Sequence, residues 1–76
     1  MENRKLSEIA FEIADDWKTV NFAAQPYLTS MAELNTIDDV YYLEEARSVV
    51  LYFLSNATGW KGETAQRIKA ELNAMI

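Results

Sequence analysis

Carboxylates are the side chains in this sequence with the most evident capacity for chemistry. Adjacent acids occur at 15–16, 38–39 and 44–45, whereas the 76 residues include no histidine and no cysteine. The chain therefore lacks the commonest general base near neutral pH, the usual nucleophilic dyads and the usual zinc ligands. Adjacent positions on a helix diverge by about 100°, so spacing alone does not turn these doublets into facing pairs. The sequence predicts a protein that is not an enzyme.

The same acids and the glycines do not form a known metal-binding or phosphate-binding motif. Asp38, Asp39 and nearby carbonyls are oxygen ligands that magnesium or calcium accepts, but the alternating ligands and terminal Glu of an EF-hand are missing. The run 59–62, Gly-Trp-Lys-Gly, lacks the spacing of a phosphate-binding loop. We expect no bound metal and no cofactor.

Aromatic rings and carboxylates are instead candidates for contact with a partner protein. Aromatic residues make up 12% of the chain; Trp60 lies beside a turn, and Tyr41 and Tyr42 lie beside acids. Large amphipathic rings at such positions suit the rim of an interface. A second interpretation, which we prefer for Trp60, is that the ring packs over the end of the central helix, because small domains bury most of their large rings. The candidate partner-binding residues are Tyr41, Tyr42, Trp60, Asp15, Asp16, Asp38 and Asp39.

Apolar residues at helical spacing indicate the elements that carry these side chains. The pattern predicts an all-α fold, one domain over 1–76, in which four helical segments form a compact bundle. The predicted segments are about 5–18, 22–34, 42–57 and 61–75.

The third segment is predicted to be the central buried helix. Its clearest apolar stripe is Ala46, Val49, Val50, Phe53, Leu54 and Ala57, and Leu51 and Tyr52 extend apolar surface beyond it. We expect the other three segments to enclose this helix.

Several boundaries are set by residues that favour turns. Pro26 predicts a kinked or late start for the second helix. The run 35–39 predicts a loop, and Thr36 and Asp39 have capping-box spacing that favours a helical turn over 40–42. Gly59 is expected to close the third helix in the left-handed conformation.

Net charge and hydropathy limit the cellular context. The chain carries −5, with ten acids and three bases in 1–45 and two acids and four bases in 46–76, so the halves carry −7 and +2. The longest apolar run, Val49 to Leu54, is far shorter than a membrane span, and no secretory pattern opens the chain. We expect a cytoplasmic protein without a membrane partner.

The segment 52–65, YFLSNATGWKGETA, together with 15–18, DDWK, resembles short uncharacterised helical proteins encoded by phages and mobile elements of Gram-positive bacteria. The resemblance implies a biological context, but it implies no activity and no binding residues.

Three functional hypotheses follow. The first is a small accessory protein that associates with another protein or with a second copy of itself. The second is a helix-turn-helix-like DNA-binding protein whose last helix presents Lys61, Gln66, Arg67 and Lys69, although the net charge of −5 argues against nucleic acid as a partner. The third is an acidic mimic of nucleic acid that blocks a basic site on a host protein.

Overall fold

The described part of the chain contains four α-helices and one short β ladder. The computed structural model describes residues 3–41 and 44–76. The helices are α1 (Leu6–Asp16), α2 (Gln25–Met31), α3 (Ala46–Ser55) and α4 (Glu63–Met75), and β1 (Val40–Tyr41) pairs antiparallel with β2 (Glu44–Glu45). The Cα radius of gyration is 11.1 Å, close to the value of about 11 Å expected for a folded chain of this length. The predicted all-α class and compact bundle are confirmed.

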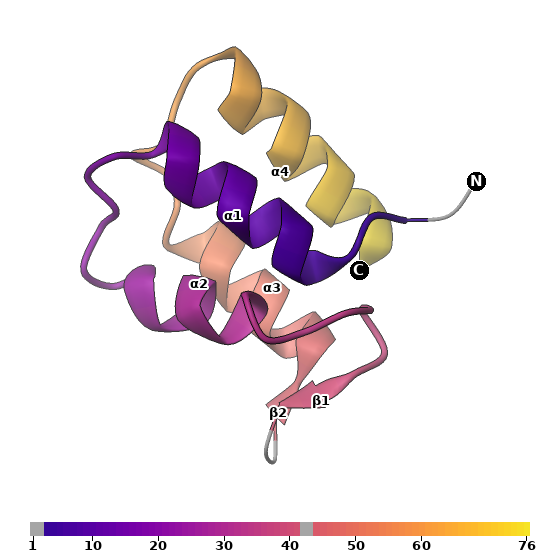
Figure 1. Cartoon of the computed structure of the whole chain (residues 1–76). Coiled ribbons are helices and arrows are strands. Elements are labelled where there is room, and N and C mark those ends of the chain that lie inside the picture. The colour runs from indigo at the N-terminus through magenta and orange to yellow at the C-terminus, as the bar shows by residue number, and fades with distance from the viewer. Residues whose placement is uncertain (1–2, 42–43) are drawn as a thin grey trace.

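The helices pack in a closed ring. Helix α1 contacts α2 and α4, and α3 contacts the same two helices from the other side. Figure 1 shows α1 and α4 side by side, with the C-terminal end of α4 close to the start of α1. One core is enclosed by the inner faces of all four helices.

Helix α3 contributes the predicted apolar stripe to this core. Ala46, Val49, Val50, Phe53 and Ala57 are fully buried, and Leu54 is partly buried. The other segments enclose the apolar stripe of α3 but not the surface beyond it, because Leu51 and Tyr52 remain 50% and 45% exposed. A helix that occupies one corner of a ring has an outer side, and these two residues lie on it.

Helix α1 is shorter than the predicted segment 5–18. Its last turn closes with a 2.7 Å hydrogen bond from Trp17 N–H to Ile13 O, and Trp17 then leaves helical geometry with ψ at 84°. The Trp17 ring turns into the core, where it packs against Phe53 and Trp60.

Helix α2 starts late, as Pro26 predicts, and Pro26 lies in its first turn. A hydrogen-bonded turn over 22–24 precedes it, with Asn21 Oδ1 accepting from Ala23 N–H. The helix ends at Met31 and not at residue 34, and the carbonyls of Leu34 and Asn35 accept from the N–H groups of Ser7 and Leu6. Leaving the helix early therefore satisfies two of the free N–H donors at the start of α1.

The start of the third segment was predicted wrongly. Residues 40–41 and 44–45 are extended and paired, with Val40 opposite Glu45. The helical turn expected from residue 40 is therefore absent at 40–41, and 44–45 do not belong to the third helix; residue 42, where that helix was expected to begin, lies outside the described residues. A β-branched and an aromatic residue favour extended backbone at this point. Ala46 N–H then donates to Asp39 O at 2.8 Å, and α3 begins.

The glycine with a positive φ is Gly62, at 113°, so the left-handed closure of the third helix expected at Gly59 is wrong. Gly62 is the N-cap of α4, and residues with a side chain rarely adopt its positive φ. It lets the chain reverse between the end of α3 and the start of α4.

Candidate partner-binding surface

Trp60 lies in the core and is only 2% exposed. Its ring stacks on Trp17 with centroids 5.8 Å apart and meets the edge of Phe53 at 6.4 Å. The indole Nε1–H donates to Asp16 Oδ2 at 2.8 Å. The preferred interpretation of Trp60 is confirmed, and its ring is not available to a partner.

The four predicted aspartates do not form one acidic site. Asp15 and Asp16 lie at the C-terminal end of α1, whereas Asp38 and Asp39 lie in the loop that reaches the N-terminal end of α1. The length of α1 separates the two pairs by about 16 Å.

Each aspartate has a local contact as well. Asp16 accepts from Trp60, Asp15 lies 3.7 Å from Lys18 Nζ, and Asp38 lies 3.7 Å from Arg47. Asp39 accepts from the N–H groups of Asn35 and Thr36 at 2.8 and 3.1 Å, which lowers the pKa of its carboxyl. The predicted capping-box pair of Thr36 and Asp39 is thus in contact, but it closes a loop turn and does not begin a helix.

The two predicted tyrosines are only partly covered by the described structure. Tyr41 contributes backbone to β1, and Tyr42 lies outside the described residues. Their role in binding stays a prediction.

The two most exposed aromatic rings among the described residues are phenylalanines that the sequence analysis did not assign. Phe11 on α1 is 68% exposed, and Phe22, in the turn before α2, is 94% exposed. Phe11 lies outside the apolar stripe of its own helix, which runs through Ile9, Ala10 and Ile13. A large ring off the buried stripe is the sequence signal for such a residue.

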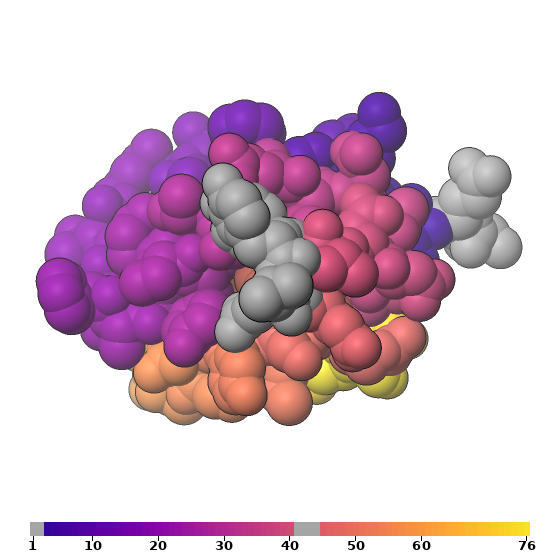
Figure 2. Space-filling view, turned by 90° about the horizontal axis from the view of Figure 1, so that it is seen from below, coloured from indigo at the N-terminus to yellow at the C-terminus, as the bar shows by residue number. Residues whose placement is uncertain are grey.

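Phe11 borders an apolar groove between α1 and α2. The groove has a volume of about 320 Å³ and is lined by Ala10, Phe11 and Ala14 from α1 and by Gln25, Leu28, Thr29, Ala32 and Glu33 from α2 and its ends. Small side chains on both helices keep the groove open. Phe22 lies three residues before Gln25, so a second exposed ring adjoins the segment that forms the groove. Figure 2 shows the face on which α2 (purple) lies beside the loop that follows it.

A larger hollow of about 500 Å³ lies at the other end of the fold. Its lining is mostly polar and includes Asn3, Arg4, Asn35, Thr36 and Asp38. The Arg4 guanidinium already binds two carboxylates of the same chain, so this hollow offers no free charge from Arg4.

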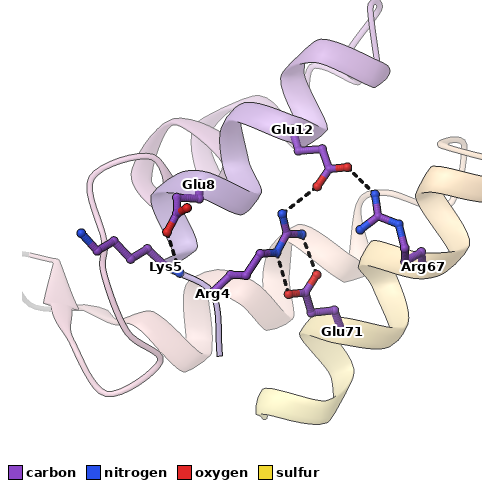
Figure 3. A network of polar contacts seen from close by, with 6 residues as sticks. All are labelled: Arg4, Lys5, Glu8, Glu12, Arg67 and Glu71. Atoms are coloured by element: carbon purple, nitrogen blue, oxygen red, sulfur yellow. Dashed lines mark hydrogen bonds and ion pairs between the residues drawn. The ribbon is translucent and has the colours of Figure 1, made fainter. Parts of the chain in front are cut away.

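Those contacts belong to an ion-pair network between α1 and α4, shown in Figure 3. Arg4 donates to both Glu71 oxygens at 2.9 and 2.7 Å and to Glu12 at 2.8 Å, and Arg67 donates to the other Glu12 oxygen. Hydrogen bonds from Arg67 and then Arg4 lower the pKa of Glu12, and the bond from Arg4 lowers that of Glu71.

Lys69 on α4 is also engaged within the chain. Its Nζ donates to Trp60 O at 2.6 Å and lies 5.8 Å from the centre of the Trp60 ring, and burial lowers its pKa. Two of the three cations that the DNA hypothesis assigns to the last helix, Arg67 and Lys69, therefore already have partners.

Within 3–41 and 44–76 no group of three or more acids is placed to hold a metal ion. No helix in these ranges combines the length and apolar character needed to cross a membrane.

Comparison of the chain with protein families, with curated proteins and with solved structures finds no match. The resemblance of 52–65 to phage-encoded proteins therefore stays a prediction.

Proposed function

We propose that this protein is a non-catalytic binding module that associates with another protein through the groove between α1 and α2. The observation that carries the proposal is Phe11, a large ring that is 68% exposed at the edge of a groove lined by alanine and leucine. Keeping such a ring in water is unfavourable, and burying a fully exposed phenylalanine side chain contributes about 2 kcal/mol. An exposed ring beside an apolar groove is typical of a partner-contact surface.

The other two hypotheses have less support. DNA binding through α4 would require Arg67 and Lys69 to give up contacts with Glu12 and Trp60. An acidic mimic of nucleic acid needs an extended array of free carboxylates, whereas the four predicted aspartates lie in two separate pairs with local contacts. The expected cytoplasmic location and the phage context accompany the proposal as predictions.

Affinity capture from the cells that produce the protein tests this proposal. We expect the wild type to retain a partner that the double variant Phe11→Ser, Phe22→Ser loses. Because both rings are mostly exposed, the melting temperature of the variant should fall by less than about 5 °C.

Leu51→Ser is the matched control, because Leu51 is a 50% exposed apolar residue on α3, away from the groove. This variant should retain the partner. Equal capture by the wild type and the Phe11, Phe22 variant would contradict the proposal, and so would equal loss in all variants.

A further inference from the structure

The rim of the α1–α2 groove carries negative charge. On the outer face of α1, Glu8 and Asp15 lie three residues before and four residues after Phe11, so each of them neighbours Phe11 on the helix surface. Glu33 lines the groove from the α2 side, and all three carboxylates belong to exposed residues. None of the described residues that line the groove is a lysine or an arginine.

Two lysines, Lys5 and Lys18, lie close to two of these three carboxylates, so acids still outnumber bases on the rim. Lys18 Nζ lies 3.7 Å from Asp15, but the two side chains are 77% and 88% exposed, so the pair is strongly screened. Glu8 accepts from the backbone N–H of Lys5, and the Lys5 side chain extends away from it in Figure 3. The rim therefore stays anionic.

Backbone chemistry indicates the conformation of the occupant. The groove walls are helices, whose interior N–H and C=O groups bond within the helix, so they offer no free edge to an extended strand. Recognition must proceed through side chains. Helix α2 has seven residues and spans about 10 Å, which matches two turns of a partner helix with apolar anchors at i, i+3 or i+4, and i+7.

Charge disfavours the other classes of occupant. A symmetric dimer would place the same patch on both subunits, so the carboxylates of the two copies would meet. Nucleic acid and anionic lipid surfaces would be repelled as well, since residues 1–45, which include both groove helices, carry −7.

We propose that the groove binds a cationic amphipathic helix of a partner protein, with apolar side chains beside Phe11 and lysine or arginine opposite Glu8, Asp15 and Glu33. This inference rests on the proposed function and names the chemistry of the partner.

Designed peptides test the inference without knowledge of the partner. Three peptides of about 15 residues, long enough to form a helix, share leucines at i, i+3, i+4 and i+7 and carry lysine, glutamine or glutamate on the remaining face. Their helicity is matched by circular dichroism. Binding is measured by titration into the ¹⁵N-labelled protein, which also maps the contacted residues.

We expect the lysine peptide to shift the amide signals of α1 and α2 and to bind at least about tenfold more tightly than the glutamine peptide. The glutamate peptide should bind least. Raising the salt concentration to about 0.5 M should remove most of the advantage of the lysine peptide.

Protein variants separate rim charge from net charge. Glu8→Gln, Asp15→Asn and Glu33→Gln together should reduce the advantage of the lysine peptide by about tenfold. A control variant changes the net charge equally at exposed positions that do not line the groove: Asp38→Asn, Glu45→Gln and Glu63→Gln. This variant should keep most of the affinity advantage of the lysine peptide.

The outcomes distinguish this inference from the proposed function. Equal affinity for the lysine and glutamine peptides, both lost with Phe11→Ser, would overturn the cationic partner and leave the groove as a binding site. Signal shifts confined to α3 or α4 would overturn the inference. Loss of the captured partner in the Phe11, Phe22 variant tests the proposed function independently.

Discussion

At the scale of single residues, Trp60 combines ring packing with a side-chain hydrogen bond. Its ring is buried against Trp17 and Phe53, and its Nε1–H donates to Asp16 at the edge of the core. A buried donor that loses its acceptor carries a desolvation cost of about 1–3 kcal/mol. Asp16 is therefore expected to contribute to stability and not to partner binding.

Asp16→Ala should lower the free energy of unfolding by about 1 kcal/mol, at the lower end of that cost because the residue is exposed and water can partly replace the carboxylate. Asp16→Asn keeps an acceptor oxygen and should recover most of the loss. Asp15→Ala is the matched control and should change stability by less than about 0.5 kcal/mol. Urea unfolding measures all three variants, and equal loss in the Asp15 and Asp16 variants would contradict the assigned contact.

The two aromatic residues Phe11 and Trp60 show what residue type alone can predict. The sequence places Trp60 beside a turn and Phe11 within a helix, yet Trp60 is 2% exposed and Phe11 is 68% exposed. The spacing of the apolar residues around Phe11 places it outside the buried stripe of its helix, so its exposure could be predicted from the sequence. The burial of Trp60 depends on Trp17, which precedes it by 43 positions and approaches it only in the folded chain.

At the scale of elements, the network around Arg4 ties the start of α1 to α4. Glu12 and Glu71 have pKa values lowered from an ordinary value of 4.5. Because the folded pKa values lie below the unfolded ones, the folded protein binds fewer protons than the unfolded chain at pH values between them. The stabilisation from these ion pairs is therefore present in full above about pH 4.5. It is lost as the pH falls through the folded pKa values.

Arg4→Gln should therefore lower the free energy of unfolding at pH 7 by about 1 kcal/mol, the size expected for a partly exposed bidentate pair. The difference from the wild type should shrink as the pH is lowered toward about 3. Lys18→Gln removes the exposed pair with Asp15 and should have little effect at any pH. Urea unfolding across the pH series measures the difference, and a difference that grows on acidification would contradict the linkage.

Helix identity was predictable, whereas several helix ends were not. All four predicted segments contain a helix, since apolar spacing reports which face is buried. The end of α2 depends on Leu6 and Ser7. Their N–H groups donate to the carbonyls of Asn35 and Leu34, which follow the helix. No local pattern around residue 31 contains that information, because the partners come from another part of the chain.

At the scale of the whole molecule, charge limits which surfaces meet. The net charge is −5, and the groove lies in the half that carries −7. Ion pairs within the chain also engage Arg4, Arg67 and Arg47, which contact Glu71, Glu12 and Asp38. The exposed ring of Phe11 lies between Glu8 and Asp15 on α1, and Glu33 lines the groove beside it, so these carboxylates oppose contact with the same patch of a second copy.

We expect the wild type to be a monomer of 8.7 kDa in light scattering at low salt. Neutralising the rim with Glu8→Gln, Asp15→Asn and Glu33→Gln removes the repulsion but keeps the apolar groove, so the mean mass should rise with concentration toward a dimer. Adding Phe11→Ser to this variant should restore the monomer, because the ring supplies the apolar contact. A wild-type dimer that dissociates with Phe11→Ser would instead identify the second copy as the occupant of the groove.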